Sequence, residues 1–207
     1  MKKFVSTVLT ILILITSVFS LNAFAQEQTR AEQWMQDFTN QEMEMRITTT
    51  LYGEETISEL YFKDGKIAST FYIPFYENIN AKTKVIINNG YIYIIFPDFP
   101  FVHFKTEITE DMLIFPEASE LTYIKSYEEQ NGSITYYIEE FTTEQNMICK
   151  YYFIGDNLIR IEAEGTDEYG EHSSSVIEIL SDEVEDSIFR IPFFSINISP
   201  FIESFYH

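Results

Sequence analysis

Hydrophobic and polar residues alternate with a period of two over much of the chain, which is the pattern of β-strands with one buried face. The clearest case is residues 42–51, where the apolar side chains fall at every second position: Met43, Met45, Ile47 and Leu51. Residues 91–96 are aromatic or aliphatic throughout, so both faces of this strand are expected to be covered.

Turn signals separate these segments. Asp-Gly or Asn-Gly pairs stand at residues 64–65, 89–90 and 131–132, and Gly155 begins a fourth turn. Such residues supply the positive φ angles that two-residue hairpin turns require. The strands expected around these turns are residues 59–63, 66–73, 84–87, 91–96, 123–125, 134–138, 147–153 and 158–163. The pattern predicts an antiparallel meander.

One early segment has a helical period instead. Thr29 and Glu32 have the spacing of a capping box, and the apolar residues that follow fall on one helix face: Ala31, Trp34, Met35 and Phe38. The helix is expected to end near residues 39–40. The remaining segments are expected to be a proline-containing loop at 96–101, a short helix or flap at 109–120, and an apolar tail from 193 that packs on the body.

The first 25 residues have the order of a secretory signal peptide: two lysines, an apolar run over residues 4–21, and an Ala-Phe-Ala site at residues 23–25. An uncleaved N-terminal anchor is the alternative, since the apolar run is nearly long enough to span a bilayer. The pattern therefore predicts export across the cytoplasmic membrane, to the periplasm or the outside. It predicts a single domain over residues 26–207, with no integral membrane segment after cleavage.

Composition narrows the function. The formal net charge is −20, so a nucleic-acid partner is disfavoured by repulsion from phosphate. The chain is 45% hydrophobic and 16% aromatic, which indicates a packed core. Cys149 is the only cysteine, so no internal disulfide is possible. Its position within a strand pattern predicts a buried small side chain and not a nucleophile.

No catalytic motif stands out, and the protein is expected to be non-enzymatic, without catalytic residues, metal or cofactor. Residues 167–172, with the letters DEYGEH, offer oxygen and imidazole ligands, and residues 182–186 form a second acidic stretch. A solvated loop is the ordinary explanation of both.

The order of one helix followed by an unbroken antiparallel sheet is also the order of a known superfamily. Four local stretches carry the similarity: residues 34–53, 61–66 (YFKDGK), 88–93 (NNGYIY) and 187–192 (SIFRIP). In these features the chain resembles the periplasmic lipoprotein carriers, the outer-membrane lipoprotein-sorting proteins. The resemblance implies a strongly curved antiparallel sheet that forms an incomplete β-barrel, with the N-terminal helix packed across it. The carriers have an arginine just after the second-strand lysine, where this chain offers only Lys66.

This fold class, mainly β with one helix, predicts binding of an apolar ligand in the concave face: an acyl chain, a lipid or a lipidated peptide or protein. The expected lining comprises Trp34, Phe38, Met43, Met45, Ile47, Phe71, Tyr91, Tyr93 and Phe101. The alternative is an exported protein-interaction or sensory module with a filled core and no lipid ligand. The sequence leaves the oligomeric state open.

Overall fold

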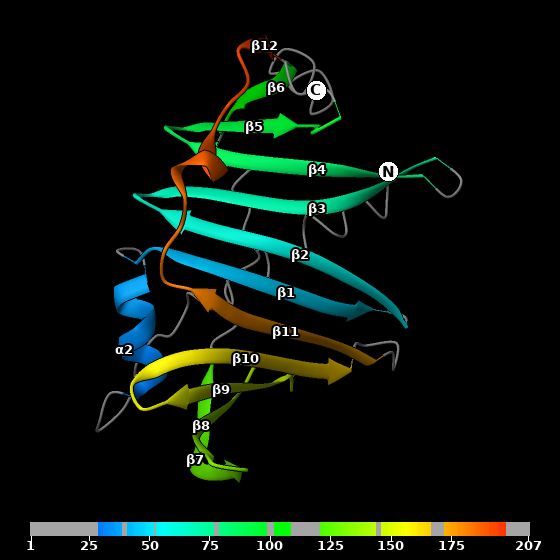
Figure 1. Ribbon diagram of the computed structural model, residues 1–207. Coiled ribbons are helices and arrows are strands. Elements are labelled where there is room, and N and C mark those ends of the chain that lie inside the picture. Colours follow the sequence, from blue (N-terminus) through cyan, green and yellow to red (C-terminus); the bar gives the residue numbers. More distant parts are fainter. Residues whose placement is uncertain are drawn as a thin grey trace. The chain divides into compact units, whose positions relative to one another are not determined.

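The computed structural model describes residues 29–38, 41–51, 53–76, 79–98, 102–108, 121–143, 146–166 and 172–197 (Figure 1). The chain forms two compact units. Unit 1 comprises residues 1–39, 45–57 and 115–180, and unit 2 comprises residues 40–44, 58–114 and 181–207. The predicted signal peptide lies outside the described residues, and the prediction of one domain stays a prediction.

Unit 1 holds the only α-helix of the described residues. Its elements are α2 (Arg30–Asp37), most of β1 (Met43–Leu51), the first residues of β2 (Glu54–Lys63), β7 (Thr122–Asn131), β8 (Ile134–Thr142), β9 (Ile148–Ile154), β10 (Asn157–Thr166) and most of β11 (His172–Ser181). The last five strands are hydrogen-bonded in the order β11-β10-β9-β8-β7, and every neighbouring pair among them is antiparallel.

Unit 2 contains most of β2 and the rest of the strands. Its other elements are β3 (Lys66–Tyr76), β4 (Ile79–Asn88), β5 (Tyr91–Ile95), β6 (Val102–Glu107), the 3-10 helix η3 (Asp186–Phe189) and β12 (Phe194–Asn197). Their order is β2-β3-β4-β5-β6-β12, antiparallel except that β12 runs parallel to β6.

The sheet is open. Among the described strands, β7 pairs only with β8 and β12 pairs only with β6, so each is an edge strand and no pairing closes a barrel. The predicted class, an open and mainly antiparallel sheet with one α-helix, is confirmed. The strands β6 and β12 were not predicted, and no bounds were predicted for β11. Most of the other strands are longer than the apolar segments from which they were predicted.

Two hairpins turn as the sequence predicts. Asp64 and Gly65 have φ angles of 50° and 70°, and Asn89 and Gly90 have φ angles of 50° and 76°. Positive φ at both central residues is the signature of a type I′ turn, which matches the twist of the flanking strands. The turns fix Lys63 opposite Lys66 in the β2–β3 pair.

The other two predicted hairpins, β7–β8 and β9–β10, have a glycine with positive φ at the first loop position only. In the β7–β8 pair Asn131 lies opposite Ile134, so the loop is Gly132 and Ser133, one residue later than the Asn-Gly pair predicted. Gly132 has a φ of 62°, whereas Ser133 does not have a positive φ. Glycine at the first of two loop positions is the type II′ pattern.

The helix α2 is held at its N-terminus by two carboxylates. Thr29 and Glu32 form the predicted capping box, with Thr29 N–H donating to Glu32 Oε2 at 2.8 Å and Glu32 N–H donating to Thr29 Oγ1 at 3.2 Å. The next two N–H groups, of Arg30 and Ala31, donate to the two carboxylate oxygens of Glu139 at 3.0 and 2.9 Å. Glu139 lies on β8 and is only 2% exposed. These bonds satisfy N–H groups that have no partner within the helix. The helix ends at Asp37, two to three residues before the predicted end.

The core of unit 1 is aromatic. Phe141, Tyr151 and Phe153 are each at most 1% exposed, and the rings of Phe141 and Tyr151 meet edge to face with centroids 5.3 Å apart. The strand β1 has alternating buried positions, as its sequence predicts.

We expect Glu139→Ala to lower the free energy of unfolding by about 1–3 kcal/mol, because it leaves the first N–H groups of α2 buried without an acceptor. Urea unfolding followed by circular dichroism measures the change. Glu164→Ala, on an exposed position of β10, is the matched control and should change stability by less than about 0.5 kcal/mol. Equal effects of the two substitutions would contradict this role for Glu139.

A candidate binding pocket beside Lys63

A surface pocket of about 540 Å³ lies in unit 2. Three segments build it: the start of β1 with the residue before it, the end of β2, and residues 181–188, which link β11 to η3. The lining residues are Glu42, Glu44, Tyr61, Lys63, Ser181, Glu183, Val184, Glu185 and Ile188.

The 181–189 segment, part of which lines the pocket, buries two of its apolar side chains. Val184 and Phe189 are 5% and 7% exposed, in a cluster with Tyr61 and with residues of β3, β4 and β5. Ile188 packs against the same cluster. The segment is thus anchored to the sheet of unit 2 by burial of apolar area, and its intervening acidic residues are left at the surface.

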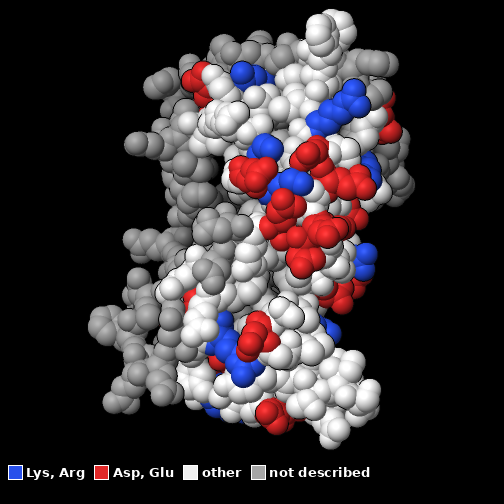
Figure 2. Space-filling view, turned by 60° about the vertical axis from the view of Figure 1, so that its left-hand side comes forward, with Lys and Arg blue, Asp and Glu red and all other residues white. Residues whose placement is uncertain are grey.

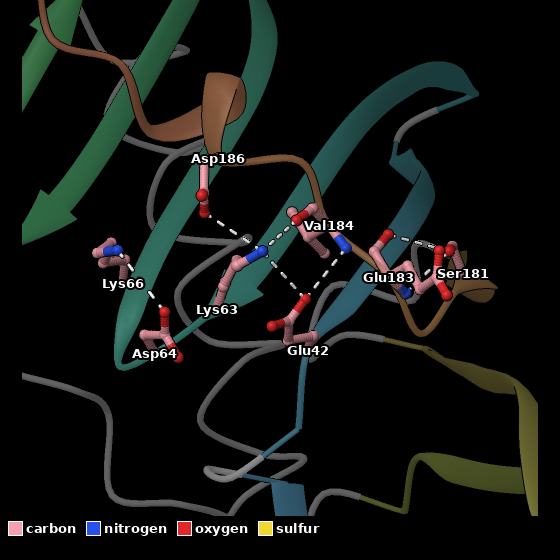
Figure 3. Close-up of polar contacts among 8 residues, drawn as sticks. All are labelled: Glu42, Lys63, Asp64, Lys66, Ser181, Glu183, Val184 and Asp186. Carbon is pink, nitrogen blue, oxygen red and sulfur yellow. Dashed lines mark hydrogen bonds and ion pairs between the residues drawn. The ribbon is translucent and has the colours of Figure 1, made fainter.

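Lys63 joins the segments of the pocket (Figure 3). Its Nζ donates to the carbonyl of Val184 at 2.7 Å and lies 3.3 Å from Glu42 Oε2 and 3.2 Å from Asp186 Oδ1. Glu42 also accepts a hydrogen bond from the N–H of Val184 at 3.4 Å. Burial lowers the pKa of Lys63, but hydrogen bonds to Asp186 and Glu42 and their charges outweigh it, so the pKa is raised above its ordinary value.

The charges of the pocket do not balance. Four glutamates line it against one lysine, and Lys63 is already paired with Glu42 and Asp186. Within the described part of the chain, no lysine or arginine lies within ion-pair distance of Glu44, Glu183 or Glu185. Figure 2 shows one face on which acidic side chains gather, with basic side chains interspersed among them.

Tyr61 forms an uncharged aromatic wall. Its hydroxyl donates to Glu59 at 3.0 Å, and the side chain is 8% exposed. Burial, the hydrogen bond to Glu59 and the negative charges of Glu59 and Glu44 all raise the pKa of Tyr61. The arrangement of carboxylates over aromatic and aliphatic surface suits an ammonium or guanidinium group with an aliphatic stem.

The residues predicted to line an apolar cavity do not line this pocket. Trp34 on α2 is partly buried, and Phe38, the C-cap residue of that helix, is 3% exposed, with their ring centroids 5.1 Å apart. Four others are buried: Met43, Met45 and Ile47 on β1 and Phe71 on β3 are 1–5% exposed. Phe101 lies outside the described residues.

The two remaining candidates are neighbours on β5. Tyr91 and Tyr93 are partly buried, with ring centroids 6.3 Å apart. Lys105 Nζ lies 3.5 Å from the Tyr91 ring centroid, and the Tyr91 hydroxyl donates to Glu107 at 3.2 Å. The structure therefore pairs Trp34 with Phe38 and Tyr91 with Tyr93, and the lining role of the nine residues stays a prediction.

The other candidate functional residues from the sequence are a cysteine and two acidic stretches, and the described residues among them show no sign of reactivity or metal binding. Cys149 is 8% exposed, and burial raises the pKa of its thiol to about 11, so the group is protonated at neutral pH. Residues 167–171 lie outside the described residues. Among the residues described, no group of three or more His, Cys, Asp and Glu side chains could hold a metal ion.

The acidic stretch 182–186 is only partly the solvated turn that was predicted. Its four acidic side chains are exposed, but Val184 is buried between them and Asp186 contacts Lys63. Lys66, the basic residue noted in the resemblance to the carriers, lies 3.9 Å from Asp64 and 5.7 Å from the Phe189 ring centroid.

Comparison with known proteins shows only weak similarity to solved structures. No protein-family profile matches the chain, and no curated protein matches it. The crystal structure of an uncharacterized conserved protein from Thermus thermophilus aligns with 82% of this chain and 99% of its own, at 9% identity and a TM-score of 0.47. The crystal structure of MucB in complex with MucA(peri) aligns over 77% of this chain and 57% of the other, at 10% identity and a TM-score of 0.41.

At these values the alignments assign neither a family nor a function, and the resemblance to the lipoprotein carriers stays a prediction. In the part of the chain that is described, α2 has only eight residues, and no helix there has the length and apolar character to cross a membrane.

We expect Lys63→Met to lower the urea midpoint of unfolding at pH 7, because it leaves the Val184 carbonyl and two carboxylates without their cation. A raised pKa in the folded state means that the contribution of Lys63 is fully present below the unfolded-state value of about 10.5 and is lost as the pH rises through the folded-state value. The difference from the unsubstituted protein should therefore persist to pH 9 and shrink above pH 10.5.

Lys66→Met is the matched control, since Lys66 has a single ion pair, 3.9 Å from the exposed Asp64, besides its contact with the Phe189 ring. A difference between Lys63→Met and the unsubstituted protein that stays constant through alkaline pH would rule out the proposed electrostatic origin.

Proposed function

We propose that the protein is an exported, non-enzymatic binding module, and that the pocket beside Lys63 accepts a basic side chain of a protein partner. One observation carries the proposal: three glutamates, Glu44, Glu183 and Glu185, line the pocket together with apolar side chains, and the described residues provide no cation for them. The signal-peptide pattern supports a place of action outside the cytoplasmic membrane.

The size and chemistry of the pocket favour this kind of ligand. A volume of about 540 Å³ is in the range of sites that enclose a small molecule or a large side chain. A guanidinium or ammonium group would meet Glu44, Glu183 and Glu185, while its aliphatic stem would contact Tyr61 and Ile188. An anionic ligand would meet the same carboxylates and be repelled.

The charge of the whole chain favours a basic macromolecule as the source of that side chain. A formal net charge of −20 steers a positively charged partner toward the surface and raises its association rate at low ionic strength. The pocket then supplies the local specificity that net charge alone does not give.

We expect a tetra-arginine peptide with blocked ends to bind in isothermal titration calorimetry at low ionic strength. The double variant Glu44→Gln/Glu183→Gln should bind about fivefold more weakly, because each carboxylate near the surface contributes about 0.5 kcal/mol. The matched control is Glu128→Gln/Glu164→Gln, which removes the same charge from exposed positions on β7 and β10.

Equal weakening in the two double variants would show that the peptide responds to net charge, and the pocket would lose its proposed role. Binding by the unsubstituted protein should decline with added salt, as expected for partly exposed charge pairs.

A second function, binding of an acyl chain, lipid or lipidated peptide, is favoured by the partly buried aromatic residues. Trp34 on α2 and the Tyr91–Tyr93 pair on β5 keep exposed ring surface that a ligand can cover. Burial of that surface would contribute about 25 cal/mol per Å². The near-complete burial of Phe38, Met45 and Ile47, in contrast, supports a filled core around those residues.

In this second function, palmitate should change the fluorescence of Trp34, the only tryptophan of the chain. The change should saturate and should persist in high salt, because apolar burial is not screened as charge pairing is. Native mass spectrometry of the purified protein should show retained lipid. A flat palmitate titration together with a lipid-free mass would reject apolar binding and leave the basic-partner proposal intact.

A further inference from the structure

The edge strand β7 of unit 1 is long and open. It has ten residues, and all are exposed except Tyr127, which is intermediate. Among the described strands it pairs on one side only, with β8. Every second residue of such a strand directs its backbone N–H and C=O away from its partner, so β7 has a row of groups that another strand can pair with.

The side chains of β7 carry an ordered set of charges. Beyond the register shift between Tyr123 and Lys125, the pairing with β8 is regular as far as Asn131. Lys125, Tyr127 and Glu129 therefore lie on one face of the strand, and Ser126 and Glu128 lie on the other. The cation and the anion of the first face stand at equal distances on either side of Tyr127.

Because of this symmetric arrangement, β7 is complementary in charge to a second copy of itself. In an antiparallel pair related by a two-fold axis through Tyr127, each residue lies opposite the residue equally far on the other side of 127 in the second copy. Lys125 then lies opposite Glu129 of the second copy, and this charge pair occurs twice. Tyr127 lies opposite Tyr127, and Ser126 lies opposite Glu128. No like charges face one another.

The neighbouring registers lack this complementarity. An axis through Ser126 places Lys125 opposite Tyr127 and forms no charge pair. An axis through Glu128 places Glu128 against itself, which is a directly opposed like-charge contact. We propose that the partner of this edge is a second copy of the chain, whose β7 adds antiparallel to β7 in the register centred on Tyr127.

The intrachain contacts of Lys125 fit the same arrangement. Its Nζ lies 3.5 Å from Glu140, which is directly opposite on β8, and 5.1 Å from the ring centroid of Tyr127. In the paired form Lys125 has a carboxylate on either side, Glu140 of its own chain and Glu129 of the second copy. Pairing thus supplies Glu129 with a cation and forms a row of alternating charge across three strands: Glu140, Lys125 and Glu129 of the second copy.

A cysteine at the symmetry axis tests the register. Opposed Cα atoms in an antiparallel pair lie about 4.5–5.5 Å apart, within the range that a disulfide spans. Tyr127→Cys should therefore form a disulfide-linked dimer under mild oxidation, detected on a non-reducing gel. The native Cys149 should not compete, because it is buried.

Gln130→Cys is the matched control, since it is exposed on the same strand and removes no charge. In the proposed register the two copies of residue 130 are six residues apart along the strands, roughly 20 Å, and cannot be linked. Equal cross-linking of the two variants, or none by Tyr127→Cys, would overturn the register.

A charge exchange tests the recognition. By sedimentation equilibrium at 150 mM salt, the unsubstituted chain should associate reversibly into dimers. Lys125→Glu should raise the dissociation constant about tenfold, because two opposite-charge pairs become like-charge pairs. Lys125→Glu/Glu129→Lys restores opposite charges and should recover most of the affinity. Circular dichroism shows whether each variant is folded.

A monomer at every concentration, or a double variant no tighter than Lys125→Glu, would refute the proposal. If the true partner of β7 is a strand of a different protein, the purified chain will remain a monomer at every concentration. The outcome is independent of the pocket beside Lys63, which lies in unit 2.

Discussion

Chain reversal in two residues is the constraint on which the sheet depends. At Asp64-Gly65 and Asn89-Gly90 both loop residues have positive φ, a conformation that is costly for side chains other than those of Gly, Asn and Asp. Because a shift of one residue would move every side chain of a strand to the opposite face, these turns also decide which residues are buried. The position of Lys63, the last residue of β2, follows directly from the turn at Asp64-Gly65. The pocket therefore rests on the same constraint as the sheet.

The local features of the fold were predictable from the sequence. The capping box of Thr29 and Glu32 and the hairpins at residues 64–65 and 89–90 each depend on residues close together in the chain, and all were confirmed. Strand ends were less predictable. Only the start of β7 was expected, because its polar half, from Ser126 to Asn131, is an exposed edge where no hydrophobic period marks the strand. The strand β12 was missed because its partner is the parallel strand β6, and no turn between them signals the pairing.

The pocket was not predictable in the same way. Lys63 and Val184 are 121 residues apart in sequence, and Glu42 and Val184 are 142 apart, so no local motif brings them together. The acidic stretch 182–186 was noted as a candidate site in the sequence, but its run of charges alone is typical of a solvated turn. The apolar candidates show the limit of periodicity. The alternation of apolar and polar residues correctly predicted that Met43, Met45 and Ile47 are shielded from solvent. It cannot distinguish side chains buried in a protein core from side chains that line a ligand site.

The contact between Glu139 and α2 has a consequence for the order of folding. A helix of eight residues is too short to be stable alone in water. The carboxylate that binds its Arg30 and Ala31 N–H groups comes 109 and 108 residues later in the chain. The first turn of α2 can therefore be fully capped only when β8 is present. Closure of a loop over that distance in sequence is slow. The first element of the described chain therefore becomes stable only after β8 is in place, and until then Trp34 and the C-cap residue Phe38 are open to solvent.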